Sequence, residues 1–427
     1  MPVIARLSAL EILDSRGRPT VRASCELASG ARGTVSVPSG ASTGAAEALE
    51  LRDGDPSRYG GLGCRTAVAN ITGPIAEAVR NREWASQEAL DRALIELDGT
   101  PNKSRLGANA LLAVSLAFAR AVTAERKLPL YRLFAEILAP GQEPRTLPRP
   151  TINLFSGGKH AGGQVEIQDV LVVVPAATTA DEALAATFAV YRAATEICRS
   201  RYGMRPLVAD EGGLAPDFPS VEQMLEDAVS AIRRAGYEPG RDVALCVDVA
   251  SSHFFTDGHY RIGNESLPST GMIERVASWV TQYPIVSIED GLAEDDWEHW
   301  PALRQRLEGH ALALGDDLLT TNPARIRRAI ELGAANALLL KVNQIGTLTE
   351  AAEACRLARE AGWRVVVSAR SGETEDDWLT DLAVGWGGEA LKVGSITRSE
   401  RLAKWNRLLE IKAETGLPLH PWPNVAG

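Results

Sequence analysis

The second half of the chain repeats one unit, which consists of a short apolar run, a charged residue at its end and an amphipathic helix. The runs are RPLVADEGG (205–213), ALCVDVAS (244–251), YPIVSIEDG (283–291), ALALGDDL (311–318), ALLLKVNQ (337–344), RVVVSARSG (364–372) and EALKVGS (389–395). Runs of this kind predict buried strands, and their spacing leaves room for one loop and one helix after each strand. Seven such units with no antiparallel hairpin between them predict a closed parallel α/β barrel more than an open sheet.

The helices between these runs have start and stop signals. Ser220 followed by Gln223 predicts a capping box at the head of a helix with one apolar face. Asn322 before a proline predicts a second N-cap, and Gly333 predicts the end of that helix. A third helix is predicted over 349–361. Regular alternation of strands and capped helices supports the barrel.

The first part of the chain has a different pattern. Segments 11–30 and 31–44 predict antiparallel strands followed by a glycine-rich loop, and 107–125 predicts a long helix with an apolar face. The proline-rich segment 138–150 predicts a linker, and the proline-rich tail 416–427 predicts extended or disordered chain. We therefore expect two domains, an N-terminal domain over 1–138 and a C-terminal barrel over 139–427.

Each apolar run ends in a charged residue. These residues are Glu211, Asp248, Glu289, Asp316, Lys341, Arg370 and Lys392. One charge at a strand end is as often a solvated terminus as a functional group, but in a barrel the carboxyl ends of all strands meet at the face where chemistry occurs. Seven charges at equivalent positions argue against the solvated interpretation and predict one shared site.

The residue types in this set indicate magnesium chemistry. Asp248, Glu289 and Asp316 offer hard oxygen ligands from three successive strands, and the absence of clustered Cys and His disfavours zinc. Lys341 and Lys392 would repel each other near the metal, which predicts a lowered lysine pKa and a role as general base. A carboxylate substrate beside Mg²⁺ could then lose an α-proton to give an enediolate.

Composition restricts the partners and the compartment. The formal charge of −10 over 427 residues argues against a nucleic-acid or anionic-membrane surface. Five scattered cysteines without a CxxC pair predict buried, reduced thiols. The segment 1–14 contains an arginine and a glutamate where a signal peptide needs an apolar core, and no other apolar run reaches the length of a membrane span. These features predict a cytoplasmic protein.

A series of ordered motifs extends along nearly the whole chain. They are EILDSRGRPTV, VPSGASTG, EALELRDGD, LDGTPNKSRLGANA, GGKHAGG, DEGG, YPIVSIEDGL, GDDLLTTN, KVNQIGTLTE, SGETED and LKVGS. In these motifs the chain resembles the enolase family. The resemblance implies an N-terminal α+β domain that caps a TIM-like (β/α)8 barrel with irregular first strands, one or two Mg²⁺ ions, a small phosphorylated three-carbon carboxylate substrate and a homodimer or higher homo-oligomer.

The resemblance also implies a role for individual positions, motif by motif. Asp248, Glu289 and Asp316 are similar to the ligands of the first magnesium. Ser42 lies in the SGASTG loop, which resembles a lid, and is similar to a residue that helps bind a second magnesium. Lys341 resembles the base that removes the C2 proton, and Glu211 the acid that assists departure of the C3 hydroxyl. The positions similar to substrate-binding residues are His160, Gln168, Asp169, Arg370 and Ser371 for the pocket and phosphate, and Lys392 for the carboxylate.

Three positions depart from the family pattern. Ala369 replaces a histidine before the Arg-Ser pair, Asp169 replaces a glutamate, and Ser156 replaces an asparagine. Three interpretations are open. The first is an ordinary phosphopyruvate hydratase. The second is a specialised relative similar to the carboxyphosphonoenolpyruvate synthases of phosphonate and phosphinate antibiotic pathways, with a phosphonate as second co-substrate, and the third is a non-catalytic protein on the same fold. The retained acids and lysines count against the third, since an unused buried charge cluster destabilises. Loss of the histidine favours the second over the first, because one acid–base group contributes about 10² to 10⁴ in rate.

Overall fold

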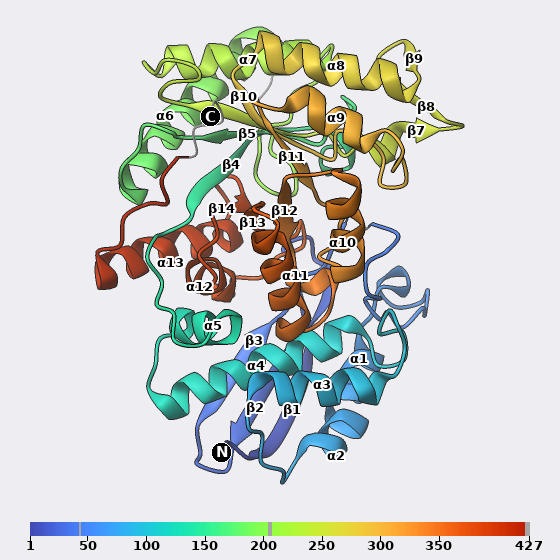
Figure 1. Cartoon of the computed structure of the whole chain (residues 1–427), viewed down its shortest axis with the longest axis vertical. Coiled ribbons are helices and arrows are strands. Elements are labelled where there is room, and N and C mark those ends of the chain that lie inside the picture. The colour runs from blue at the N-terminus through green and yellow to red at the C-terminus, as the bar shows by residue number, and fades with distance from the viewer. Residues whose placement is uncertain (42–43, 204–206, 423–427) are drawn as a thin grey trace.

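The computed structural model describes residues 1–41, 44–203 and 207–422, which form two domains (Figure 1). The N-terminal domain begins with an antiparallel sheet in the order β1-β2-β3, as predicted. Its strands and helices are β1 (Ile4–Leu13), β2 (Pro19–Leu27), β3 (Arg32–Ser36), α1 (Arg65–Asn70), α2 (Ala76–Val79), α3 (Gln87–Asp98), α4 (Ala108–Arg126) and α5 (Leu130–Leu138).

Helix α4 packs across β2 and β3 and forms the core of this domain. The approach is so close that a side chain at Gly33 would put its Cβ 2.3 Å from the carbonyl oxygen of Ala117, which only glycine avoids. By length and composition α4 could span a membrane, so the prediction that no apolar run reaches this length is wrong. In this structure 83% of its most apolar window is buried inside the protein.

The C-terminal domain is a closed barrel of eight strands, which confirms the predicted fold class. In sequence order the strands are β4 (Arg149–Ser156), β5 (Asp169–Val173), β6 (Ala244–Asp248), β10 (Ile285–Glu289), β11 (Leu312–Gly315), β12 (Ala337–Leu340), β13 (Arg364–Ser368) and β14 (Ala390–Gly394). From β6 through β14 to β4 all neighbours are parallel, whereas β5 is antiparallel to both β4 and β6.

Two sequence predictions about this barrel are wrong. Its first strand, β4, begins within the segment predicted as a linker. The antiparallel hairpin of β4 and β5 precedes the seven predicted units and agrees with the irregular first strands that the family resemblance implies. The run 205–213 is not a strand of the barrel: its described part is a loop with one isolated bridge between Val208 and Leu214. Only three apolar residues separate Pro206 from the DEGG turn, which is too few for a buried strand.

The described helices surround the barrel: two of them lie between β5 and β6, and one follows each later strand (Figure 1). They are α6 (Ala180–Tyr202), α7 (Val221–Arg234), α8 (Ser269–Gln282), α9 (Trp300–Leu307), α10 (Pro323–Leu332), α11 (Leu348–Glu360), α12 (Trp378–Gly385) and α13 (Ser399–Thr415). A small sheet of β7 (Phe255–Thr256), β8 (His259–Ile262) and β9 (Glu265–Leu267) projects beyond α8 and α9 (Figure 1).

The predicted helix signals are mostly confirmed. Asn322 accepts a hydrogen bond from a backbone N–H of α10, and Gly333 ends that helix in the left-handed conformation. Ser220 caps α7 by accepting a hydrogen bond from the Gln223 backbone N–H. A full capping box would also have the Gln223 side chain bound to the Ser220 backbone N–H, but the Gln223 amide donates to Asp227 instead. Helix α11 begins one residue earlier than predicted, because Thr347 and not Leu348 is its N-cap.

The tail is extended through residue 422 and returns to the start of the barrel. Leu419 bridges Leu147 in parallel, and the His420 N–H donates to the Leu147 carbonyl at 2.7 Å. The Arg149 guanidinium donates to the His420 carbonyl at 2.7 Å and lies over the Trp422 ring. The described tail is thus bound at the amino ends of the barrel strands, opposite the predicted site.

The cysteines are free thiols, as predicted from their scatter. Four are buried, namely Cys25, Cys64, Cys198 and Cys355, and Cys246 on β6 is partly exposed. Burial raises the pKa of each of them, to about 12 for Cys246. Thiols held in the protonated form are poor nucleophiles, so none of these side chains suggests thiol chemistry.

Candidate active site

The carboxyl end of the barrel brings the predicted charged residues together. Asp248 and Glu289 end β6 and β10, Asp316 and Lys341 directly follow β11 and β12, Arg370 follows β13 and Lys392 lies in β14. Glu211 reaches the same place from the loop before α7. A small pocket is lined by Ala41, His160, Gln168, Glu211, Asp248, Lys341, Ser368, Ala369, Arg370, Ser371 and Lys392.

The two lysines are held by the three predicted metal ligands. Lys392 Nζ donates to Asp248 at 2.9 Å and to Glu289 at 2.7 Å, and Lys341 pairs with Asp316. All five charged groups are buried or nearly so. Such a cluster is stable only while positive and negative charges compensate each other, so its members form one electrostatic unit.

These ion pairs correct the predicted lysine pKa. Burial by itself would lower the pKa of Lys341, but the Asp316 carboxylate outweighs burial and raises it above its usual range. The pKa of Lys392 is likewise raised, by Asp248 and Glu289. The predicted lowering by lysine–lysine repulsion is therefore wrong for this state, because each ammonium is paired directly with at least one carboxylate.

The carboxylates fit a hard divalent cation. Among the described residues, Glu289 Oε1 is buried without a hydrogen-bond partner, although the other oxygen of the same carboxylate is bound to Lys392. Burial raises the pKa of Glu289, and the neighbouring Asp248 charge raises it further. A carboxylate oxygen that lacks a donor beside two further carboxylates is the arrangement in which Mg²⁺ provides the missing positive charge.

Asp316 is oriented by a residue that sequence reasoning missed. The Asp290 carboxylate accepts hydrogen bonds from the backbone N–H groups of Asp316 and Asp317, at 3.0 and 2.7 Å. Ligand atoms of these three acids lie within 4.8 Å of one another. The signal available in the sequence was the acid pair of the SIEDG run, of which only Glu289 was singled out.

The predicted phosphate-binding residues have partners from the N-terminal domain. Arg370 Nη1 donates to Glu47 Oε2 at 2.9 Å and to Asn343 at 3.1 Å, and Ser371 Oγ accepts a hydrogen bond from Arg16 at 2.9 Å. Glu47 and Arg16 were not predicted, because their contacts join segments more than 300 residues apart. Two guanidinium groups beside one hydroxyl are suited to bind a phosphate.

The N-terminal loop that resembles a lid is attached close to this point. Ser39 and Gly372 exchange two backbone hydrogen bonds, at 2.8 and 3.0 Å, and Ala41 lines the pocket. Ser42, the predicted ligand of a second magnesium, lies outside the described residues. Its role therefore stays a prediction.

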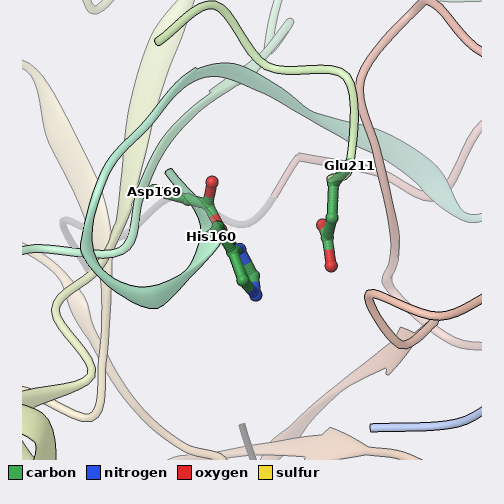
Figure 2. A group of neighbouring side chains, drawn as sticks. All are labelled: His160, Asp169 and Glu211. Carbon is green, nitrogen blue, oxygen red and sulfur yellow. Dashed lines mark hydrogen bonds and ion pairs between the residues drawn. The ribbon is translucent and has the colours of Figure 1, made fainter. Parts of the chain in front are cut away.

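The opposite side of the pocket contains a chain of hydrogen bonds. Ser156 Oγ donates to Asp169 Oδ1 at 2.5 Å, and the other carboxylate oxygen of Asp169 lies 2.9 Å from His160 Nδ1. Figure 2 shows the second ring nitrogen of His160 pointing away from Asp169, on the same side as the Glu211 carboxylate. Ligand atoms of these three residues lie within 4.8 Å of one another. Since Asp169 already binds Nδ1, we interpret this group as an acid–base cluster.

Glu211 and Gln168 are each attached to a neighbouring strand. The Asn153 amide of β4 donates to Glu211 at 3.1 Å, and the Gln168 amide donates to Asp248 at 3.0 Å. Burial by itself would raise the pKa of Glu211, but His160 and other nearby cations outweigh burial and lower it. Glu211 is thus held as a carboxylate in this state.

Comparison with protein families agrees with both halves of this architecture. A family model described as "Enolase, N-terminal domain" matches residues 4–134, and one described as "Enolase, C-terminal TIM barrel domain" matches residues 144–418. The matched segments include the whole barrel and the loops that hold the charged pocket. The chain therefore belongs to the enolase family.

Proposed function

We propose that this protein is a Mg²⁺-dependent enzyme that acts on a phosphorylated three-carbon carboxylate of the 2-phosphoglycerate and phosphoenolpyruvate type. Family membership supports an enolase-superfamily enzyme. The observation that carries the proposal is the buried group of Lys341, Lys392 and three carboxylates beside Arg370 and Ser371. In the proposed reaction this group would supply a base, a carboxylate-binding cation and a phosphate-binding pair around one small pocket.

Each of these side chains has a separate task in the proposed reaction. Arg370 and Ser371 bind the phosphate, and Lys392 binds the substrate carboxylate next to Asp248 and Glu289. Lys341 takes the proton from C2 as a neutral amine, a form that its pairing with Asp316 disfavours and that a cation held by Asp316 would favour. Asp248, Glu289 and Asp316 would hold Mg²⁺, and the chemistry that the ion supplies when bound is positive charge, which offsets these carboxylates and the charge that develops on the substrate.

We further propose that the protein is a specialised enolase-like enzyme similar to the carboxyphosphonoenolpyruvate synthases, with a phosphonate as second substrate. Ala369 supports this choice: it follows β13, lines the pocket beside Glu211 and His160, and presents only a methyl group there. The metal-binding and phosphate-binding residues are retained, so the change is confined to the side of the substrate's leaving group. A methyl group leaves more room there and removes a polar contact.

The alternative is an ordinary phosphopyruvate hydratase, which converts 2-phosphoglycerate into phosphoenolpyruvate and water. It is favoured by the presence of His160, Asp169 and Glu211, which can still move protons on that side. A homodimer, a cytoplasmic location and a domain division after residue 138 belong to the same proposal, since they follow from the family resemblance and the sequence.

A hydratase assay tests the choice. The purified protein should form phosphoenolpyruvate from 2-phosphoglycerate slowly, followed by absorbance, and Ala369→His combined with Asp169→Glu should raise the rate. Ala369→Leu is the matched control, because it fills the same space without a polar group and should bring no gain. A wild-type kcat of a typical enzyme, about 1 to 10³ s⁻¹, would contradict the specialised function and leave the hydratase.

A further inference from the structure

The inside of the barrel is not completely filled below the charged residues. Along a strand every second side chain points inward, so the next layer toward the amino end consists of the residues two positions earlier. Below Asp248, Glu289 and Lys392 these residues are Cys246, Ser287 and Ala390. Barrel interiors are usually filled by bulky branched side chains, whereas these three are small. A cavity of about 60 Å³ remains there, several times the about 10–15 Å³ that one water molecule needs.

The wall of this cavity is mostly apolar. Its apolar side chains include Leu171, Val173, Leu312, Leu314, Val366 and Ala390. A purely polar solute would lose its hydrogen bonds to water against such a wall, whereas an apolar chain would lose none. Lys392 lines both this cavity and the active pocket, so one layer of side chains separates the two.

At the amino end of the barrel the cavity is lined by a buried arginine that no carboxylate neutralises. Arg149, the first residue of β4, is 6% exposed. Its Nε donates to the His420 carbonyl at 2.7 Å, and its Nη1 donates to the carbonyls of Val174 and Ala177 at 2.9 and 3.0 Å. Within the described ranges no acid pairs with Arg149, and its Nη2 makes no hydrogen bond. Burial lowers the pKa of this guanidinium, and no neighbouring carboxylate opposes the effect.

The other residues at this end leave an excess of positive charge. Arg364, the first residue of β13, adds a second guanidinium, and Glu389 is the one acid among the lining residues there. One oxygen of Glu389 already accepts a hydrogen bond from the Val365 N–H at 2.8 Å. The ring of Trp422 lines the cavity and lies 5.9 Å from the Arg149 guanidinium. A buried cation of this kind is normally paired, so the arrangement favours an anionic ligand.

We propose that this cavity is a second binding site, separate from the active pocket, which takes a small monocarboxylate with a short apolar chain. The carboxylate accepts a hydrogen bond from Nη2 of Arg149, and the chain lies against the apolar wall. Its single negative charge matches the excess of one positive charge left by Arg149, Arg364 and Glu389. The inference depends only on the amino end of the barrel and not on the proposed function.

Butyrate at neutral pH is the probe, and isothermal titration is the measurement. Wild type should bind butyrate more tightly than 1-butanol, which has the same chain without the charge, and should not bind butylammonium. Arg149→Met keeps the apolar stem and should weaken butyrate binding at least about tenfold, because a charge-assisted hydrogen bond is lost. Arg325→Met is the matched control and should bind as wild type does. Arg325 also donates to two backbone carbonyls and lies over a tryptophan ring, that of Trp297.

Two further variants locate the probe. Ala390→Val fills part of the cavity and should weaken the binding of butyrate and 1-butanol alike, whereas Ser371→Ala changes the active pocket and should leave both unchanged. Absence of butyrate binding in wild type would overturn the inference, and so would equal affinity of butyrate and butylammonium, a comparison that needs no variant. Equal binding by wild type and folded Arg149→Met would also overturn it. Loss of binding in Ser371→Ala but not in Ala390→Val would place butyrate in the active pocket and overturn it as well.

Discussion

At the level of single residues, each buried cation of the pocket is paired with a carboxylate from another element. Lys341 binds Asp316, Lys392 binds Asp248 and Glu289, and Arg370 binds Glu47. Replacing one partner of such a pair leaves a buried charge without compensation, which costs several kcal/mol. Conservative replacements at these positions therefore separate chemistry from folding better than deletions do.

The role of Lys341 as base predicts a loss of turnover without a loss of binding. Lys341→Ala should lower turnover by at least about 10² and still bind 2-phosphoglycerate, because Lys392, Arg370 and Ser371 remain. Lys341→Arg is the control: it keeps the charge beside Asp316 but cannot act as a base at neutral pH. Isothermal titration and turnover measured on the same samples test this, and an alanine variant of full activity would refute the role.

The role of Asp316 as metal ligand predicts a loss of stabilisation by magnesium. For wild type, Mg²⁺ at 100 times its dissociation constant should add about 2.7 kcal/mol to the free energy of unfolding, and EDTA should remove it together with activity. Asp316→Ala should show little shift of its melting temperature with MgCl₂. The exposed Asp295, replaced by Ala, should respond as wild type does; equal shifts in all three proteins would exclude Asp316 from the site.

At the level of elements, α11 begins against the N-terminal domain. Asp91 of α3 accepts hydrogen bonds from the Thr349 backbone N–H at 2.9 Å and from its hydroxyl at 2.7 Å, and Lys103 pairs with Glu350. A carboxylate at a helix N-terminus meets both unpaired N–H groups and the positive end of the helix dipole. The first domain therefore caps a barrel helix.

Asp91 makes the free energy of unfolding depend on pH, and its raised pKa determines the direction. Burial raises its pKa from 3.8 to about 6, although hydrogen bonds from Thr349, Ser115 and Gln87 oppose the increase. Between these values the folded state binds a proton that the unfolded state lacks, so stability falls as pH rises from about 4 to about 6. The full effect is about 3 kcal/mol.

Asp91→Asn should remove this slope, because an amide does not titrate. Urea unfolding of wild type and variant at several pH values between 4 and 7 measures the difference. Gln87→Ala is the matched control: it removes a hydrogen-bond donor to Asp91 but keeps the carboxylate, and should retain the slope. Parallel pH profiles of wild type and Asp91→Asn would show that Asp91 does not titrate in this range.

At the level of the whole molecule, the N-terminal domain completes the pocket. Glu47 binds the Arg370 guanidinium through both carboxylate oxygens, at 2.9 and 3.1 Å, and the side chains are only 8% and 2% exposed. A substrate phosphate would compete with this carboxylate for the guanidinium. Substrate binding and domain contact are therefore coupled.

Glu47→Gln tests this coupling with inorganic phosphate as probe. The variant keeps the shape of the side chain but loses its charge, so it should melt at a lower temperature than wild type, and phosphate should raise its melting temperature by more than that of wild type. Asp381→Asn, which removes a buried carboxylate bound to Arg407 instead, should lower the melting temperature without a larger phosphate response. Equal phosphate responses in all three proteins would contradict competition at Arg370.

The amino-acid sequence by itself determined the fold class and the set of charged residues, because both depend on local patterns: apolar runs of strand length, capped helices and one charge at the end of each run. Six of the seven runs predicted as strands lie in the barrel, and all seven charged residues meet at its carboxyl end. Tertiary structure decided the antiparallel direction of β5. Asp169 is the first residue of this strand, yet it lies beside residues such as Asp248 that are the last of their strands. Tertiary structure also decided the pairing of Glu47 with Arg370 and the raised lysine pKa values, because these depend on distances between segments far apart in the chain, which no local pattern encodes.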